Sequence, residues 1–253
     1  MPEPRPTDPR LLIIVPAYNE EAAIGHVVRS VRYWNPQAPV LVIDDCSTDA
    51  TVRLAREAGA ELLLLPHHLG LGGCVQAGYK LAFERGYDYV IRVDGDGQHE
   101  AGDIPRILEA LERSGCDMVI GSRYLASRHN NHYSSLPRRI GIWGFRKMLR
   151  LLLGKPVHDP TSGFVGVNRR ALEVFSRSFP LAYPEIEALV VLQRKAFRFV
   201  EIPCKSGRRM GGRSSITPLK SLSYLVHVLL GVFVNILRYD GRSRRRWSRR
   251  KGD

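Results

Sequence analysis

The chain has 253 residues, 44% of them hydrophobic, and a formal net charge of +13. This length allows one large domain or two small ones, and the hydrophobic content excludes a globally disordered protein. The basic excess favours anionic partners such as nucleotides, lipid phosphates, acidic membranes or nucleic acid. The four cysteines form no Cys-x-x-Cys pair, which argues against a disulfide framework or a zinc site and favours a reducing compartment.

The first half of the chain alternates short apolar strands with helices. Residues 1–10 are polar and proline-rich, so we expect a disordered N-terminus without a signal segment. The predicted strands are residues 11–15, 40–43, 61–65, 89–93 and 118–120. The predicted helices are residues 20–34, 46–58 with N-cap candidates at 46–49, 70–85 and 103–113. This alternation predicts an α/β fold with a mostly parallel central sheet and helices on both faces.

The fourth predicted strand ends in Asp94-Gly-Asp-Gly-Gln-His99. In open α/β sheets the ligand crevice lies beyond the carboxyl ends of the strands. Asp94, Asp96 and Gln98 are two residues apart, so an extended backbone would point all three the same way. Three oxygen ligands on one side suit Mg²⁺ or Mn²⁺. The alternative, an Asp-Gly turn between two strands, is equally open, although a helix-like segment follows here.

The second half is less regular. We predict a polar loop at 126–137, a basic helix at 140–153, a loop at 157–164 entering a short strand, a helix from Pro184 and a strand at 197–202. A Gly/Arg loop at 206–215 leads into an apolar helix at about 218–237. The domain prediction is therefore a disordered 1–10, a globular 11–215, a membrane-associated helix at 216–238 and a disordered basic tail at 239–253.

The end of the chain indicates contact with a membrane surface. Residues 221–237 are uncharged but slightly short of the ~20 residues that span a bilayer, and a narrow polar stripe runs along them. This pattern fits an interfacial helix, or one packed on the globular domain, better than an isolated span. The tail from Arg238 has eight Arg or Lys and two Asp, which suits anionic lipid. A disordered tail, or one that contacts nucleic acid, is equally consistent with this composition.

Several blocks together resemble the inverting family 2 glycosyltransferases. They are Pro-Ala-Tyr-Asn-Glu, Val-Ile-Asp-Asp-Cys-Ser-Thr-Asp, the Gly-rich helix start, Asp-Gly-Asp-Gly-Gln-His, Gly-Ser-Arg-Tyr, Asp-Pro-Thr-Ser-Gly-Phe and Arg-x-x-x-Gly-Arg-Ser-Ser. The blocks run in the order of that family over about residues 11–237, and the closest branch is the dolichol- or polyprenyl-phosphate sugar synthases. The resemblance implies the GT-A fold, a nucleotide-sugar-binding α/β domain.

The resemblance also implies a donor site. The residues that would line the nucleotide pocket are Pro16, Ala17, Tyr18 and Glu20. Asp45 would accept a hydrogen bond from the base, although a turn or N-cap role is the alternative. Asp94 and Asp96 would bracket the metal and the diphosphate, with Gln98 as a further ligand. Gly72, in the turn 70–73, either lets a helix N-terminus face phosphate or packs the helix against the sheet.

The two histidines before this turn and His99 give weaker signals. The family usually has Asn where His68 stands, which puts that side-chain contact in doubt. His67, His68 and His99 are scattered single histidines, which are more often surface or capping residues than metal ligands.

The acceptor side is basic. A lipid phosphate is already ionised and needs positive charge rather than a general base, whereas a sugar hydroxyl needs a base. Arg123 and Arg213 match family motifs and are predicted to hold phosphate, ahead of Arg208 and Arg209, whereas Arg138 and Arg139 are interpreted as surface charge. Asp159 and Glu187 would act as a base or orient the acceptor, or are structural. The implied catalytic set is Asp96, Asp159, Glu187, Arg123 and Arg213.

We therefore predict a metal-dependent hexosyltransferase. Its donor would be a nucleotide-diphosphate sugar of the GDP-mannose or UDP-glucose type, and its acceptor a polyprenyl or dolichyl phosphate. It would be cytoplasmic and peripheral at the inner face of a membrane. The alternatives are transfer to a glycan or another hydroxyl acceptor in cell-envelope synthesis and, disfavoured by the lack of a known nucleic-acid module, a basic nucleic-acid-binding protein.

Overall fold

The computed structural model describes residues 10–126, 147, 149–150, 154, 156–181 and 183–207. Several predictions lie outside these residues. They are the disordered N-terminus, the loop at 127–137, most of the helix at 140–153, Arg138, Arg139, Arg208, Arg209, Arg213, the apolar helix at 218–237 and the basic tail.

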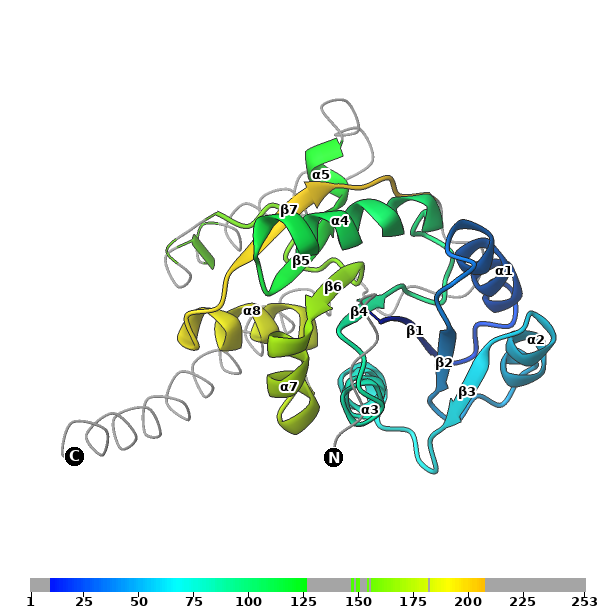
Figure 1. The fold of residues 1–253 in the computed structure, drawn as a ribbon. Coiled ribbons are helices and arrows are strands. Elements are labelled where there is room, and N and C mark those ends of the chain that lie inside the picture. Colours follow the sequence, from blue (N-terminus) through cyan, green and yellow to red (C-terminus); the bar gives the residue numbers. More distant parts are fainter. Residues whose placement is uncertain are drawn as a thin grey trace, which may run out of the picture.

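A seven-stranded sheet forms the centre of the described residues (Figure 1). Its strands are β1 (Leu11–Ala17), β2 (Val40–Asp44), β3 (Glu61–Leu64), β4 (Tyr89–Arg92), β5 (Met118–Ser122), β6 (Val165–Asn168) and β7 (Phe199–Pro203). The strand order is β3-β2-β1-β4-β6-β5-β7. Only β6 is antiparallel, to both β4 and β5, and the other pairs are parallel. The predicted α/β fold with a mostly parallel sheet is confirmed.

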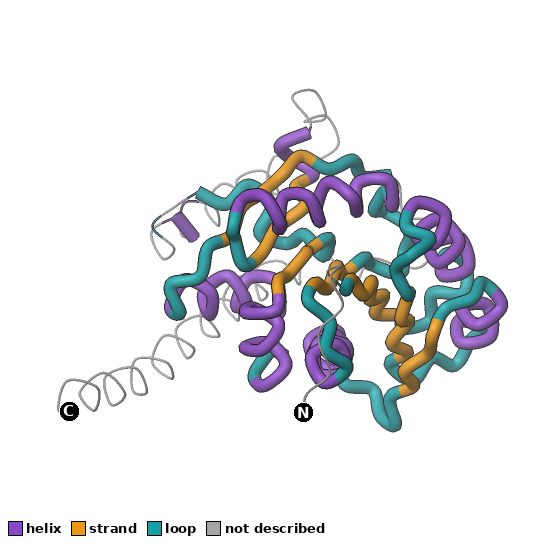
Figure 2. Tube along the Cα trace, in the orientation of Figure 1, coloured by secondary structure: helices purple, strands orange, loops and turns teal. Residues whose placement is uncertain are grey.

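Helices cover both faces of this sheet, as Figure 2 shows in purple. The helices are α1 (Ile24–Trp34), α2 (Thr51–Glu57), α3 (Gly70–Glu84), the short 3₁₀ helix η1 (Ala101–Asp103), α4 (Ile104–Ser114), α5 (Arg123–Ala126), α7 (Arg169–Arg177) and α8 (Pro184–Arg194). One hydrophobic cluster joins the sheet to α1, α2 and α4, and a second joins it to α3, α7 and α8. None of the helices in this part of the chain is long and apolar enough to cross a membrane.

The central strand β1 feeds both clusters because successive side chains of a strand point to opposite faces. Leu12 and Ile14 belong to the α3 side, whereas Ile13 and Val15 belong to the α1 side. All four are fully buried, as expected for a parallel strand covered by helices on both faces.

One local prediction was wrong, and one helix was missed. The helix predicted from Glu20 begins at Ile24, because the Glu20 carbonyl accepts the N–H groups of Ala23 and Ile24 in a turn before the helix. Helix α7 was not predicted. Asn168 caps it by accepting the N–H of Ala171 through its side chain, a local signal that the sequence does contain.

Candidate functional site

The candidate site lies where β1, β2 and β4 end side by side. Strands β1 and β2 are parallel with Ala17 opposite Asp44, and β1 and β4 are parallel with Ile14 opposite Arg92. The loops after these strands therefore emerge at one edge of the sheet, where open α/β sheets bind ligands.

Side-chain hydrogen bonds join the loop after β1 to the loop after β2. The Asn19 N–H donates to Ser47 Oγ at 2.9 Å, and the Thr48 N–H donates to Asn19 Oδ1 at 2.8 Å. The Glu20 N–H donates to Thr51 Oγ1 at 2.8 Å. The two loops thus form one unit, in which the backbone of Asn19 and of the predicted pocket residue Glu20 is held by the short polar side chains of Ser47 and Thr51.

Asp45 is buried and anchors the segment before α3. Its Oδ1 accepts the N–H of Leu69 at 2.7 Å, and its Oδ2 lies 3.0 Å from Nδ1 of His68. The His68 ring lies 4.3 Å from the ring of Tyr18, which is 46% exposed. The carboxylate therefore helps to hold this turn, and an exposed aromatic ring lies against its histidine partner.

Gly72 is a packing glycine. A Cβ atom there would lie 2.5 Å from Cα of Leu181, so the backbones approach too closely for any side chain. The packing alternative is therefore what the structure contains at this position. Gly95 similarly lies against the end of β1, since a Cβ there would come within 3.1 Å of the Pro16 carbonyl oxygen, with the buried Ala17 beside it.

Asp94 is part of a buried ionic network. Arg92, at the end of β4, donates to Asp94 Oδ1 from Nη2 at 3.0 Å and to Glu185 Oε1 at 2.8 Å. His99 Nε2 lies 3.1 Å from Asp94 Oδ2, and its ring stacks on Phe164 with centroids 5.0 Å apart. Burial alone would raise the pKa of Asp94, but the charge of Arg92 and the His99 hydrogen bond outweigh it and hold that pKa well below its usual range.

The sequence reading missed Arg92 and Glu185 and misjudged His99. His99 was interpreted as more often a surface or capping residue, yet its side chain is buried against Asp94. The signal for Arg92 was present, because an arginine inside an apolar strand requires a buried acidic partner. Which acid supplies it depends on the placement of α8 and was not readable.

Asp96 and Gln98 form a tight turn rather than an extended row with Asp94. Asp96 Oδ1 accepts the N–H of Gln98 at 3.0 Å, and Gly97 has a φ of 77°. The expectation that an extended backbone aligns all three side chains is therefore wrong. The described ranges contain no group of three or more His, Cys, Asp or Glu arranged to hold a metal ion. The oxygen donors of Asp96 and Gln98 nevertheless suit a hard cation, whereas both Asp94 oxygens already have partners.

Arg123 and Asp159 form a tight pair beside the end of β5. The backbone N–H, Nε and Nη2 of Arg123 donate to Asp159 at 3.0, 2.8 and 2.7 Å. Asp159 is fully buried, and its hydrogen bonds raise the pKa of Arg123 above its ordinary value. The structure thus brings two predicted catalytic residues together, with the carboxylate engaged by the guanidinium.

Glu187 lies in the first turn of α8. Its Oε1 accepts the N–H of Tyr183 at 3.2 Å, just before the helix begins. Glu185, two residues earlier, binds Arg92.

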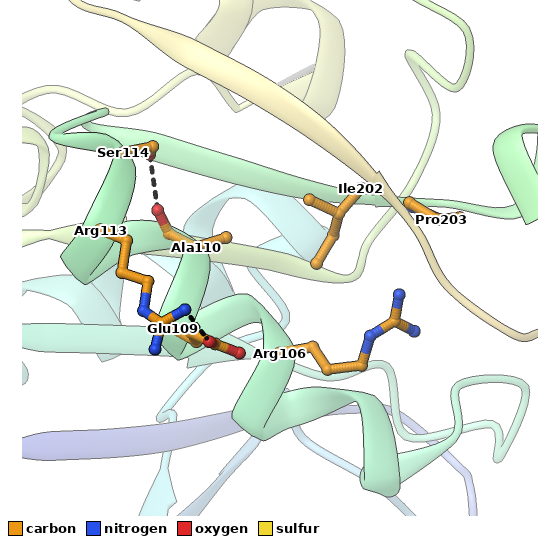
Figure 3. Close-up of a pocket in the computed structure, with 7 residues that line it drawn as sticks. All are labelled: Arg106, Glu109, Ala110, Arg113, Ser114, Ile202 and Pro203. Atoms are coloured by element: carbon orange, nitrogen blue, oxygen red, sulfur yellow. Dashed lines mark hydrogen bonds and ion pairs between the residues drawn. The ribbon is translucent and has the colours of Figure 1, made fainter.

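A separate cavity of about 380 Å³ lies between α4 and the end of β7 (Figure 3). Its lining includes Arg106, Glu109 and Arg113 on α4 and Ile202 and Pro203 on β7. None of the predicted site residues lines it, so we place the candidate site at the strand ends instead.

The fold and the polar strand ends define an α/β protein whose candidate ligand site lies at the carboxyl edge of its sheet. The chain matches glycosyl transferase family 2 over residues 12–175. It belongs to that family, and the predicted enzyme class, a family 2 glycosyltransferase, is confirmed.

Curated relatives share about a third of the aligned residues. The chain is 33% identical over 184 residues to the polyprenol monophosphomannose synthase of Mycolicibacterium smegmatis. This alignment covers 67% of this chain and 65% of that protein. It is 30% identical over 216 residues to the undecaprenyl-phosphate mannosyltransferase of Micrococcus luteus, covering 82% of this chain and 88% of that protein. The chain thus spans just under two thirds of the first relative and most of the second.

Solved structures share the fold. The glucosyl-3-phosphoglycerate synthase from Mycobacterium tuberculosis, in complex with Mg²⁺ and uridine diphosphate, has a TM-score of 0.65 at 21% identity. The alignment covers 92% of this chain and 80% of that one. The same enzyme with Mn²⁺, uridine diphosphate and phosphoglyceric acid has a TM-score of 0.67, covering 90% and 78%. At this identity the likeness shows the α/β fold alone, with neighbours that are GT-A-like.

Proposed function

We propose that the chain is a GT-A enzyme that transfers a hexose from a nucleotide-diphosphate sugar to a polyprenyl phosphate at a membrane surface. The observation that carries this proposal is Arg123, whose guanidinium donates two hydrogen bonds to the buried Asp159, while its backbone N–H donates a third. The two relatives above, a polyprenol monophosphomannose synthase and an undecaprenyl-phosphate mannosyltransferase, support the acceptor class.

The engaged carboxylates favour a phosphate acceptor over a hydroxyl. A phosphate is already ionised near neutral pH, so its oxygen attacks the anomeric carbon without a base as the bond to the diphosphate breaks. Asp159 is paired with Arg123, and Glu187 accepts the N–H of Tyr183 at the start of α8. Nε and Nη2 of Arg123 donate to Asp159, so the phosphate would meet the Nη1 edge of this guanidinium, and Arg213 is proposed to add a second guanidinium.

The donor would bind over the loops after β1 and β2. The exposed Tyr18 ring offers a face on which the base could stack. Tyr18 contacts the ring of His68, which in turn contacts Asp45, and Glu20 lies in the same pair of loops. We propose a GDP-mannose or UDP-glucose type of donor, with Asp45 accepting an N–H of the base. Asp96 and Gln98 would hold Mg²⁺ or Mn²⁺, and Asp94 would add its negative charge beside them. The bound ion would neutralise the charge developing on the departing nucleoside diphosphate.

The decisive experiment measures sugar transfer from each candidate donor, with Mn²⁺, to a short polyprenyl phosphate and to the matching polyprenol. We expect sugar transfer to the polyprenyl phosphate and none to the polyprenol. Arg123→Ala should lose turnover severely, because a preorganised charge is removed. Arg113→Ala is the matched control, since that arginine pairs with Glu109 on the exposed side of α4. Transfer to the alcohol but not to the phosphate, with Arg123→Ala near normal, would overturn the proposal.

A further inference from the structure

Glu201, in the middle of β7, is a buried carboxylate surrounded by N–H donors. Its side chain is 8% exposed. The backbone N–H of His158 donates to its two oxygens at 3.0 and 2.8 Å, and the backbone N–H of Asp159 donates to Oε1 at 2.7 Å. The His158 ring adds Nδ1 at 2.9 Å from Oε2. A carboxylate that receives so many hydrogen bonds holds the 158–159 backbone firmly.

The same backbone carries the carboxylate that holds Arg123. Asp159 is bound to Glu201 through its backbone N–H and to Arg123 through its side chain. The chain of contacts therefore runs from Glu201 on β7, through the loop after residue 156, to the guanidinium after β5. Strands β5 and β7 are parallel with Ile120 opposite Glu201, so both ends of this chain rest on neighbouring strands of one sheet.

The segment that follows Glu201 also reaches the loop after β4. Ser206 forms an isolated antiparallel bridge with His99, and the Gly207 N–H donates to the Gln98 carbonyl at 2.8 Å. Within seven residues, one stretch of chain thus contacts the loop that orients Arg123 and the turn that contains Asp96. This arrangement suits a residue that sets the position of the acceptor charge relative to the donor turn.

We propose that Glu201 is a positioning residue for the transfer: it holds the 158–159 backbone so that Asp159 aims Arg123 at the acceptor phosphate. The proposal deepens the proposed function and rests on it for the identity of the acceptor. Glu201 acts through Arg123 and does not itself touch the reacting atoms.

The first test is spectroscopic and needs no acceptor. In protein labelled with ¹⁵N-arginine, the Nε–H signal of Arg123 is assigned by its loss in Arg123→Lys. In Glu201→Gln we expect this signal to shift and to exchange with water at least about tenfold faster, because the amide replaces one acceptor oxygen by a donor. Glu109→Gln, which removes the same charge from an exposed ion pair on α4, should leave the signal unchanged.

The second test is a kinetic double-mutant cycle with polyprenyl phosphate. Glu201→Gln should lower kcat/KM for the acceptor by roughly tenfold to a hundredfold, the cost of a small misplacement of a catalytic group. When Glu201→Gln is added to Arg123→Ala, we expect little further loss of kcat/KM, since both substitutions remove the same interaction between Arg123 and the acceptor phosphate. Donor binding, measured by titration calorimetry, should be unchanged in Glu201→Gln. Glu201→Asp keeps the charge and should recover part of the loss, and it replaces Glu201→Gln if that variant fails to fold.

Two results would overturn the positioning role. One is an Arg123 Nε–H signal in Glu201→Gln identical to that of the wild type, and the other is a pair of losses that multiply in the double variant. A wild-type protein that does not use polyprenyl phosphate would instead overturn the proposed function, and the Arg123 signal would still decide the role of Glu201.

Discussion

At the scale of single residues, the candidate site depends on how its buried charges are compensated. Arg92 binds both Asp94 and Glu185, so this trio keeps one net negative charge beside Asp96. Without Glu185, Arg92 would cancel Asp94 and leave the turn with less attraction for a cation. The charge beside Asp96 therefore depends on the paired aspartates that the sequence shows and also on Glu185 of α8, which compensates Arg92.

Asp94 should contribute stability that depends on pH. Its pKa is lowered in the folded protein, so its contribution is complete well above the unfolded pKa of about 4 and is lost as the pH falls below it. Asp94→Asn should lower the free energy of unfolding at pH 7 by about 1–3 kcal/mol, the range for a lost charged hydrogen bond. Urea unfolding of both proteins between pH 7 and pH 3 checks this. A difference that stays constant over that range would contradict it.

Asp45→Ala should weaken nucleoside diphosphate binding by roughly 1–3 kcal/mol, through the lost hydrogen bond to the base and the freed 68–69 backbone. Isothermal titration with Mn²⁺ and a panel of nucleoside diphosphates measures this. The matched control is Asp88→Ala, which removes a carboxylate that accepts the exposed Arg10 N–H before β1. Equal dissociation constants in wild type and Asp45→Ala would count against the nucleotide role.

At the scale of elements, the start of α3 is placed by a close contact between backbones. Leu69 is held by Asp45, and Gly72 lies against the backbone of residues 180–181, which precede α8. Gly72 is therefore required by packing of one element on another, whatever else the helix N-terminus does.

Gly72→Ala should destabilise the protein by about 1–3 kcal/mol, since the added methyl group meets backbone that must shift. Gly25→Ala is the matched control in α1. Its added Cβ would meet only the flexible end of Arg29, at 3.2 Å, so the higher helix propensity of alanine should stabilise by up to about 1 kcal/mol. Thermal and urea unfolding give the sign of each change. A neutral Gly72→Ala would show that the 180–181 segment yields without cost.

At the scale of the whole molecule, the strand order assembles the site from distant parts of the chain. Placing β1 between β2 and β4 brings the loops after residues 17, 44 and 92 to one edge. The position of β6 between β4 and β5 then puts Phe164 against His99. The position of β7 beside β5 puts Glu201 in contact with the backbone of Asp159, the residue that binds Arg123.

If this edge holds a divalent cation, chelation should abolish transfer reversibly. We expect activity to disappear in excess EDTA and to return with Mn²⁺ or Mg²⁺, because charge on the departing diphosphate is no longer neutralised. Asp96→Ala should abolish transfer and weaken Mn²⁺ binding measured by titration calorimetry with nucleoside diphosphate. Asp88→Ala, on the loop before β4, again serves as the control. Full activity of the purified protein in excess chelator would rule out the metal.

The sequence by itself determined the class of fold and many residues of the candidate site. Alternating apolar runs with polar strand ends predicted the α/β sheet, because buried parallel strands and amphipathic helices leave different hydrophobic periods. Asp96 and Gln98 could be proposed because turn and carboxylate chemistry is local in sequence, whereas Tyr18 and Asp45 were proposed from the resemblance to family 2 glycosyltransferases.

Only the tertiary structure decided which charges meet. Arg92 pairs with Glu185, Arg123 pairs with Asp159, and the backbone N–H of Asp159 donates to Glu201, across 93, 36 and 42 residues of sequence. No local pattern distinguishes Glu185 from Glu187, which lie two residues apart at the start of α8, yet Glu185 binds Arg92 and Glu187 accepts the N–H of Tyr183. The direction that each side chain takes is set by the packing of α8 and β7 on the sheet. That packing is a property of the assembled core, which is why motif and spacing alone could name the carboxylates but not their partners.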